Sequence, residues 1–176
     1  MPEPDGLDPA IVVGLTDLPI ADVRARRAAC QAVETELSYV RRLVQGRLDI
    51  VRYELSRRSA GTQTDLPDIV DHLRDILADA TRAPGNGHLP TVLAPGAVDA
   101  ELLSRLDEIA EPGRLSDPAV LDEAELARTA EGLAEFEQEL STRRREVFGR
   151  IDTLQEEMVR RYRTGEANVD TLFGRG

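Results

Sequence analysis

Five side chains with rich hydrogen-bonding chemistry recur at fixed spacing between residues 34 and 49. On a helix, which turns by about 100° per residue, this spacing places all five on one stripe. A carboxylate accepts two parallel hydrogen bonds, such as those that the N1–H and N2–H₂ groups of guanine offer. Arginine donates a fork of hydrogen bonds to guanine or phosphate, and serine and glutamine reach phosphates or base edges. The five residues are Glu34, Ser38, Arg41, Gln45 and Asp49.

The same pattern occurs a second time along the chain. Ten of the 16 residues in 34–49 are identical in 137–152, too many for a chance match between two helices of similar composition, so we interpret the match as an internal repeat. Phe148 stands where the first copy has Gln45. Phenylalanine forms no hydrogen bond, but it stacks on a flat base or packs beside it. The second copy consists of Glu137, Ser141, Arg144, Phe148 and Asp152.

A glycine lies within each copy, at Gly46 and Gly149. Glycine inside a helix costs about 1 kcal/mol relative to alanine, so its repetition calls for a reason. Two interpretations are open: close approach of a flat ligand to the backbone, or close contact between two helices. The polar stripes also have a simpler interpretation, a solvated helix face with ion pairs between successive turns. The repetition of Ser, Gly and the Arg–Asp spacing argues against it.

Two long helices must carry these copies. No helix breaker other than Gly46 occurs between about residues 20 and 59, and the second long helix is predicted over about 122–163. Apolar residues spaced by three and four run along both and border the polar stripes, which predicts an all-α fold with an antiparallel coiled coil, linked by short helices and loops. These apolar residues are Leu37, Val40, Val44, Leu48, Val51 and Leu55, then Leu133, Phe136, Leu140, Val147, Ile151, Leu154 and Met158.

Glycine and proline divide the rest of the chain. Thr16 or Asp17 is the expected N-cap of the first long helix, and Val12, Val13 and Leu15 are candidates to dock the arm that precedes it. Short helices are predicted near 67–80 and 99–110, a loop over 83–97, and a break over 111–118. The segments are a flexible N-terminal arm (1–19), a long helix (20–60), an acidic connector (61–119), a second long helix (120–164) and a C-terminal tail (165–176).

Composition excludes several classes of protein. The net charge is −11, and residues 60–130 hold five Arg against 14 acids, which argues against nucleic-acid binding and suits a basic protein surface. Cys30 is the single cysteine, and His72 and His88 are too far apart for a metal or catalytic set, so we expect no enzyme. No apolar run approaches the ~20 residues of a membrane span, and the acidic start is unlike a signal peptide. We therefore expect a cytoplasmic protein.

The spacing E-x₃-S-x₂-R-x₃-Q-x₃-D resembles the cyclic di-GMP signature of the RsiG family of actinobacterial anti-sigma factors. The surrounding LSYVRRLVQGRLDIV is also similar to that family, and the resemblance is strongest over 34–55 and 131–163. It implies an antiparallel coiled coil whose ten motif residues hold two cyclic di-GMP molecules as a dimer. It further implies that the nucleotide promotes a complex with a WhiG-type sigma factor, of the flagellar and sporulation class, and so represses its transcription.

The resemblance also suggests a role for each motif residue. Both Asp residues are expected to read guanine edges, and both motif Arg residues to contact guanine or phosphate. Both Ser residues and Gln45 are expected to add polar contacts, and both Glu residues to orient an Arg or to accept a hydrogen bond from a base. Without nucleotide, we expect the two Arg-rich stripes to face each other and repel. The second-rank ligand contacts are Arg42, Arg47, Arg145 and Arg150.

Other interpretations remain open at this stage. We expect a monomer that mimics a dimer through its internal repeat. The rivals are a structural coiled-coil adaptor without ligand, a nucleotide-signalling enzyme, and a cyclic di-GMP sensor with a different protein partner. Nucleotide binding would distinguish the structural adaptor from the other two rivals. Catalytic turnover of the nucleotide would identify the enzyme.

Overall fold

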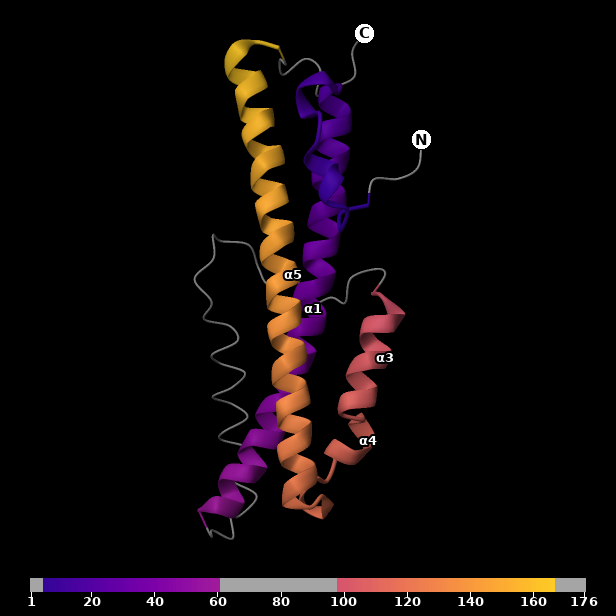
Figure 1. The fold of residues 1–176 in the computed structure, drawn as a ribbon, viewed down its shortest axis with the longest axis vertical. Helices are drawn as coiled ribbons and strands as arrows, with labels where there is room; N and C mark the ends of the chain where they lie inside the picture. The colour runs from indigo at the N-terminus through magenta and orange to yellow at the C-terminus, as the bar shows by residue number, and fades with distance from the viewer. Residues whose placement is uncertain (1–4, 61–97, 167–176) are drawn as a thin grey trace. The chain divides into compact units, whose positions relative to one another are not determined.

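A computed structural model describes residues 5–60 and 98–166 of the 176-residue chain (Figure 1). The expected helix near 67–80 and loop over 83–97 lie outside the described residues. The elements, in chain order, are the 3₁₀ turns η1 (Pro9–Val12) and η2 (Leu15–Asp17), the helices α1 (Ile20–Ser59), α3 (Ala100–Ile109) and α4 (Pro112–Leu115), the 3₁₀ turn η3 (Pro118–Val120) and the helix α5 (Glu123–Thr164).

The all-helical prediction is confirmed, since α1 and α5 pack against each other with short helices between them in sequence. Both long helices have nearly the predicted bounds, because each begins and ends close to helix-breaking residues in the sequence. The predicted N-cap is wrong: Thr16 and Asp17 belong to η2, and the carbonyl of Pro19 accepts the first helical N–H groups, those of Asp22 and Val23. The predicted break over 111–118 contains one helical turn, α4, which starts at Pro112, a position where a missing N–H costs nothing.

The chain divides into two compact units. The first contains the residues up to Leu43 and those from Phe136 onward, and the second contains Val44–Glu135. No helix in the described part of the chain has the length and apolar character that crossing a membrane requires.

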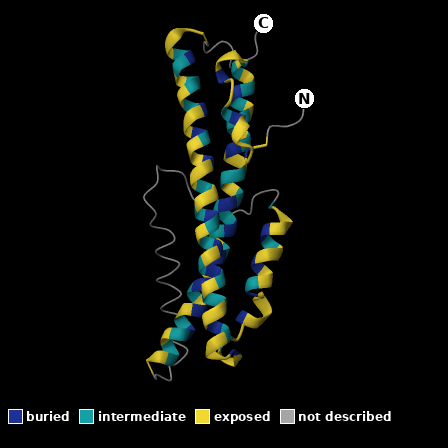
Figure 2. Ribbon diagram, in the orientation of Figure 1, coloured by how far each residue is buried: buried dark blue, intermediate teal, exposed yellow. Residues whose placement is uncertain are grey.

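In the first unit, α1 and α5 run antiparallel around an apolar seam. Contacts between them join Arg24 to Tyr162, Glu34 to Arg144 and Arg41 to Glu137, so residue numbers rise along one helix as they fall along the other. Figure 2 shows the buried residues along both helices. The predicted seam is confirmed, because every predicted residue of this unit is buried except the half-buried Met158. The buried ones are Leu37, Val40, Phe136, Leu140, Val147, Ile151 and Leu154.

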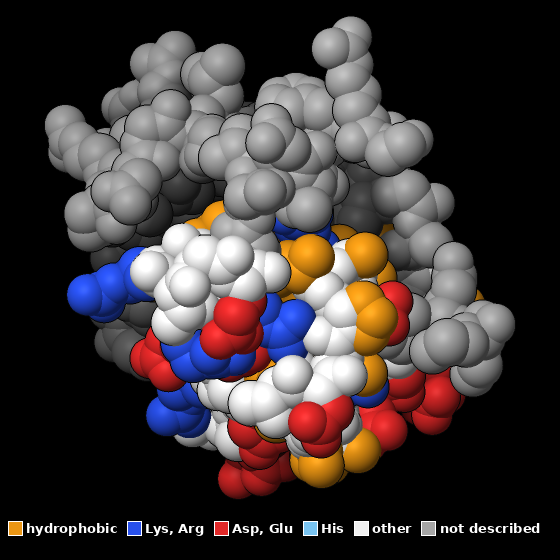
Figure 3. Space-filling model, turned by 90° about the horizontal axis from the view of Figure 1, so that it is seen from above, with side chains coloured by type: hydrophobic (Ala, Val, Ile, Leu, Met, Phe, Trp, Pro, Cys, Tyr) orange, Lys and Arg blue, Asp and Glu red, His pale blue; other side chains and the backbone are white. Residues whose placement is uncertain are grey.

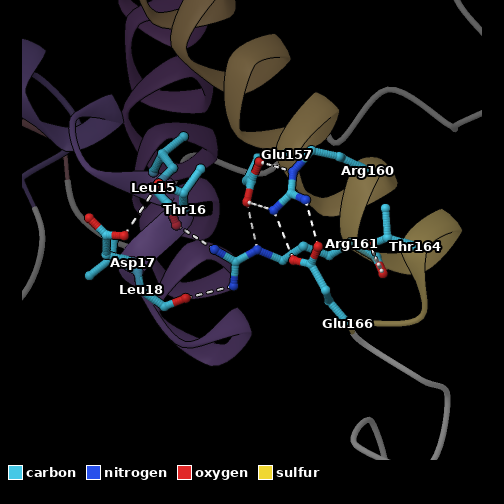
Figure 4. A network of polar contacts seen from close by, with 9 residues as sticks. All are labelled: Leu15, Thr16, Asp17, Leu18, Glu157, Arg160, Arg161, Thr164 and Glu166. Atoms are coloured by element: carbon cyan, nitrogen blue, oxygen red, sulfur yellow. Dashed lines mark hydrogen bonds and ion pairs between the residues drawn. The ribbon is translucent and has the colours of Figure 1, made fainter.

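The arm before α1 is folded against the first unit from Asp5 onward. Ile11 and Leu15 are buried, whereas Val13 is exposed. Arg161, a buried residue of α5, donates hydrogen bonds to the carbonyls of Leu15 and Leu18, and its Nε lies 2.6 Å from Glu157 (Figure 4). Seen from above, acidic and basic side chains interleave beside exposed hydrophobic ones (Figure 3).

The second unit surrounds an apolar cluster of its own. Asp99 caps α3, because its side chain accepts a hydrogen bond from the Glu101 N–H at 2.8 Å. α3 approaches α5 at Gly132, where a Cβ atom would lie 3.1 Å from the Ile109 side chain. Among the described residues of this unit, the buried apolar ones are Val44, Leu48, Val51, Leu102, Leu106, Ala110, Leu115, Leu121, Leu126 and Leu133.

Candidate ligand-binding site

Two ion pairs join the motif copies across the first unit. Arg41 Nη1 lies 2.7 Å from Glu137 Oε1, and Arg144 Nε lies 2.7 Å from Glu34 Oε1. The repeat matches Arg41 with Arg144 and Glu34 with Glu137, so one pair becomes the other when the helices are exchanged. Each motif Glu therefore contacts a motif Arg of the opposite helix.

The motif serines complete the same network. Ser38 Oγ donates to Glu34 Oε1 at 2.6 Å, and Ser141 Oγ donates to Glu137 Oε1 at 3.0 Å. Each carboxylate oxygen therefore accepts from a serine on its own helix and from an arginine on the opposite helix. Shared acceptors of this kind hold both partners in a defined orientation.

The expected repulsion between two Arg-rich stripes is wrong at the motif arginines. Arg41 and Arg144 each face a glutamate of the opposite helix. The antiparallel register brings opposite charges together, so the network is neutral without any ligand. A gating mechanism that depends on neutralising two repelling cations does not apply to these two residues.

Both motif arginines keep hydrogen-bonding capacity beyond their ion pairs. Among the described residues, the two Nη atoms of Arg144 and the Nε and Nη2 atoms of Arg41 have no hydrogen-bond partner. Their side chains are 32% and 26% exposed, so both arginines are partly accessible to solvent. Guanidinium N–H groups held in place suit phosphate oxygens and the acceptor edge of guanine. The donor set thus fits a nucleotide.

The remaining motif residues differ in their surroundings. The Arg144 guanidinium carbon lies 4.8 Å from the centre of the Phe148 ring, which is 39% exposed. Asp152 is exposed one turn further along α5. Gln45 and Asp49 belong to the second unit and are half-buried. The first unit contains the other eight motif residues: Glu34, Ser38, Arg41, Glu137, Ser141, Arg144, Phe148 and Asp152.

The two glycines of the repeat lie beside open space. A Cβ atom built on Gly46 or on Gly149 would meet no described atom within 4 Å, apart from its chain neighbours and its own helix backbone. Close contact between helices is therefore not the reason for either glycine in the described part of the chain. Approach of a ligand to the backbone stays open as the reason.

Most of the second-rank arginines have structural roles. Arg47 Nη1 donates to the carbonyls of Ala110, at 2.6 Å, and Leu106, and its Nη2 lies 2.7 Å from Asp107. Arg47 thus anchors the C-terminal end of α3 rather than standing open to a ligand, and no spacing in the sequence signals this contact. Arg145 donates to the carbonyl of Ser141, Arg150 donates to that of Gly6, and Arg42 is exposed.

Two segments of the chain match one protein family. A family model described as RsiG-like matches residues 12–77 and 112–175. The chain belongs to the RsiG-like family. Each matched segment contains one motif copy, so the internal repeat and the family match coincide. RsiG-like membership implies a regulatory role of the anti-sigma type rather than catalysis. No curated protein matches the chain.

Other chemistry has little support in this RsiG-like chain. The described residues contain no group of three or more His, Cys, Asp or Glu side chains that could hold a metal ion. Cys30 is buried beside the arm, where its thiol approaches the Gly6 carbonyl and burial raises its pKa. A buried thiol with a raised pKa is a poor nucleophile, so Cys30 acts as a packing residue.

Proposed function

We propose that this protein is an anti-sigma factor that binds a cyclic di-GMP dimer along the motif residues of α1 and α5. In the loaded form it sequesters a WhiG-type sigma factor and represses its transcription. The observation that carries the proposal is the reciprocal network Arg41–Glu137 and Arg144–Glu34. A ligand with two guanines and two phosphates, related by a twofold axis, matches a site whose halves are related in the same way.

The residues divide the work of binding as follows. Arg41 and Arg144 contact phosphate or guanine through the N–H groups that their glutamates leave over. Asp49 and Asp152 read the N1–H and N2–H₂ edge of guanine, and Ser38, Ser141 and Gln45 add polar contacts. Glu34 and Glu137 position the arginines in advance, which lowers the entropy lost on binding.

The nucleotide acts by completing a surface for the sigma factor. A ligand shifts a binding equilibrium only by its differential affinity for the free and the complexed protein. Bound cyclic di-GMP supplies that difference if it contacts the sigma factor or orders residues that do. By thermodynamic linkage, the sigma factor must then tighten nucleotide binding by the same factor.

Calorimetric titration with cyclic di-GMP, with and without a WhiG-type sigma factor, tests the proposal. We expect saturation near two nucleotides per chain and tighter binding when the sigma factor is present. If cyclic di-GMP binds but the sigma factor does not change its affinity, the protein is a cyclic di-GMP sensor with a different protein partner. If cyclic di-GMP binds in neither condition, it is not the ligand of this protein.

One observation favours a ligand-free structural adaptor as the second candidate. The Glu, Ser and Arg side chains of the motif already pair with one another. An adaptor predicts that Arg144→Ala leaves partner binding intact, whereas the anti-sigma proposal predicts that it weakens nucleotide and sigma binding together. Arg143→Ala, at the exposed position on the other side of Arg144, is the matched control.

A further inference from the structure

We infer that the Arg144 guanidinium, stacked over the Phe148 ring, forms with it a platform on which a purine base stacks, so that the second motif copy binds its base differently from the first. This inference rests on the proposed function, because it assigns part of the same site. It concerns the one motif position at which the two copies differ in chemistry, Phe148 against Gln45.

The geometry of the pair fits a stacking surface. Phe148 follows Arg144 by one turn of α5, and the guanidinium carbon lies 4.8 Å from the ring centre, within the ~6 Å range of a cation–ring contact. Glu34 binds the Nε edge of the guanidinium at 2.7 Å and so restrains its orientation. The guanidinium lies over the Phe148 ring, so the pair is a stack with an outer flat face at each end, and bases stack on both kinds of group.

Packing does not explain the aromatic residue. Phe148 is 39% exposed, whereas Phe136, further back on α5, is 1% exposed and belongs to the apolar seam. Phe148 thus lies outside the apolar seam, next to a polar network, although more than half of its surface is covered. The neighbouring Gly149 leaves open space beside the same helix turn, since a Cβ atom there meets no described atom outside its own helix within 4 Å.

The two copies therefore differ in how they hold a base. Gln45 offers a carbonyl and an amide group, which read polar edges. Phe148 offers only a face, so it adds affinity for any purine without reading its edge. The first copy contributes more of the base selectivity, and the second contributes stacking.

Tryptophan substitution provides a direct test, because the chain contains no tryptophan. Phe148→Trp keeps a stacking ring and introduces a fluorophore at this single position. We expect cyclic di-GMP to quench its emission in step with the calorimetric binding curve. Val159→Trp, at another exposed position of α5, is the control and keeps its emission.

Two further variants separate stacking from polar contacts. Phe148→Leu keeps an apolar side chain but removes the stacking face, and we expect it to weaken cyclic di-GMP binding about tenfold. Phe148→Gln, which copies the first motif, reports whether a polar residue replaces the lost contact. Circular dichroism confirms that each variant folds.

The outcomes distinguish the two proposals. If the unmodified protein binds cyclic di-GMP while Phe148→Trp shows no quenching, or while Phe148→Leu binds as tightly as the parent, the platform is overturned and the anti-sigma proposal stands. If the unmodified protein binds no cyclic di-GMP, both proposals fall.

Discussion

Arg41 on α1 lies 2.7 Å from Glu137 on α5, and the internal repeat relates this pair to Arg144 and Glu34. The side chains of Arg41 and Glu137 are 26% and 21% exposed, and partly solvated pairs of this kind contribute only about 0.5 kcal/mol each. Breaking these ion pairs therefore costs little free energy. A ligand that rearranges the network loses little binding energy by doing so.

Exchanging the charges of one pair separates structure from ligand binding. Arg41→Glu places two carboxylates in contact and lowers the free energy of unfolding by about 1 kcal/mol. The double variant Arg41→Glu, Glu137→Arg restores most of that stability, measured by urea denaturation, but leaves cyclic di-GMP binding at least about tenfold weaker. Recovery of both properties in the double variant would show that the arginine has no ligand role at position 41.

The repeat glycines should combine a stability cost with a binding role. Gly46→Ala and Gly149→Ala each raise the free energy of unfolding by about 1 kcal/mol, since the added methyl group meets open space. We expect both to weaken cyclic di-GMP binding in calorimetry. Gly132→Ala is the matched control: its Cβ atom meets Ile109 at 3.1 Å, so it gains less stability, and it leaves nucleotide binding unchanged. If Gly46→Ala and Gly149→Ala are more stable but bind the nucleotide normally, these glycines have no role in ligand binding.

Arg161 should hold the arm against the first unit. Its side chain is 7% exposed and binds Glu157 and the carbonyls of Leu15 and Leu18. Arg161→Met leaves the two carbonyls without this donor, removes one of the two arginines that bind Glu157, and lowers the free energy of unfolding by about 3 kcal/mol. Arg163→Met, at an exposed position two residues later, changes it by less than about 0.5 kcal/mol. Equal urea midpoints for the two variants would contradict this role.

Acid should weaken the same cluster through Glu157. Hydrogen bonds from Arg160 and then Arg161 lower the pKa of Glu157 from 4.5 to about 2. A carboxyl group whose pKa is lowered by folding stabilises the folded state above pH 4.5, and this contribution is lost as the pH falls toward 2. We expect the melting temperature of the protein to fall more steeply over this range than that of Glu157→Gln. Parallel curves would show that Glu157 does not contribute to the acid sensitivity.

Arg47 should stabilise α3 without affecting the ligand. Arg47→Leu removes the donors to Ala110 and Leu106 and the ion pair with Asp107. We expect backbone amides of α3 to exchange hydrogen about tenfold faster, as loss of about 1.4 kcal/mol predicts. Cyclic di-GMP affinity stays within about twofold of the parent. Arg52→Leu, at an exposed position of α1 outside the motif copies, is the control. If Arg47→Leu binds the nucleotide more weakly and Arg52→Leu does not, Arg47 belongs to the ligand site.

Local signals account for what sequence reasoning predicted correctly about the fold. The start of α1 depends on Pro19 before it, and the seam through Leu37 and Leu140 follows from apolar spacing along each helix. These features involve neighbours in the chain. The turn α4 was missed because Pro112 suits a helix start as well as a break.

The sequence by itself determined the two long helices, the repeat and the ten motif residues, because each depends only on residue types and spacing. Only the tertiary structure decided that Arg41 and Arg144 face Glu137 and Glu34 rather than each other, and that Arg47 serves α3. The register between antiparallel helices comes from side chains packing across the seam. Residues far apart in the chain therefore acquire partners that spacing along one helix does not specify.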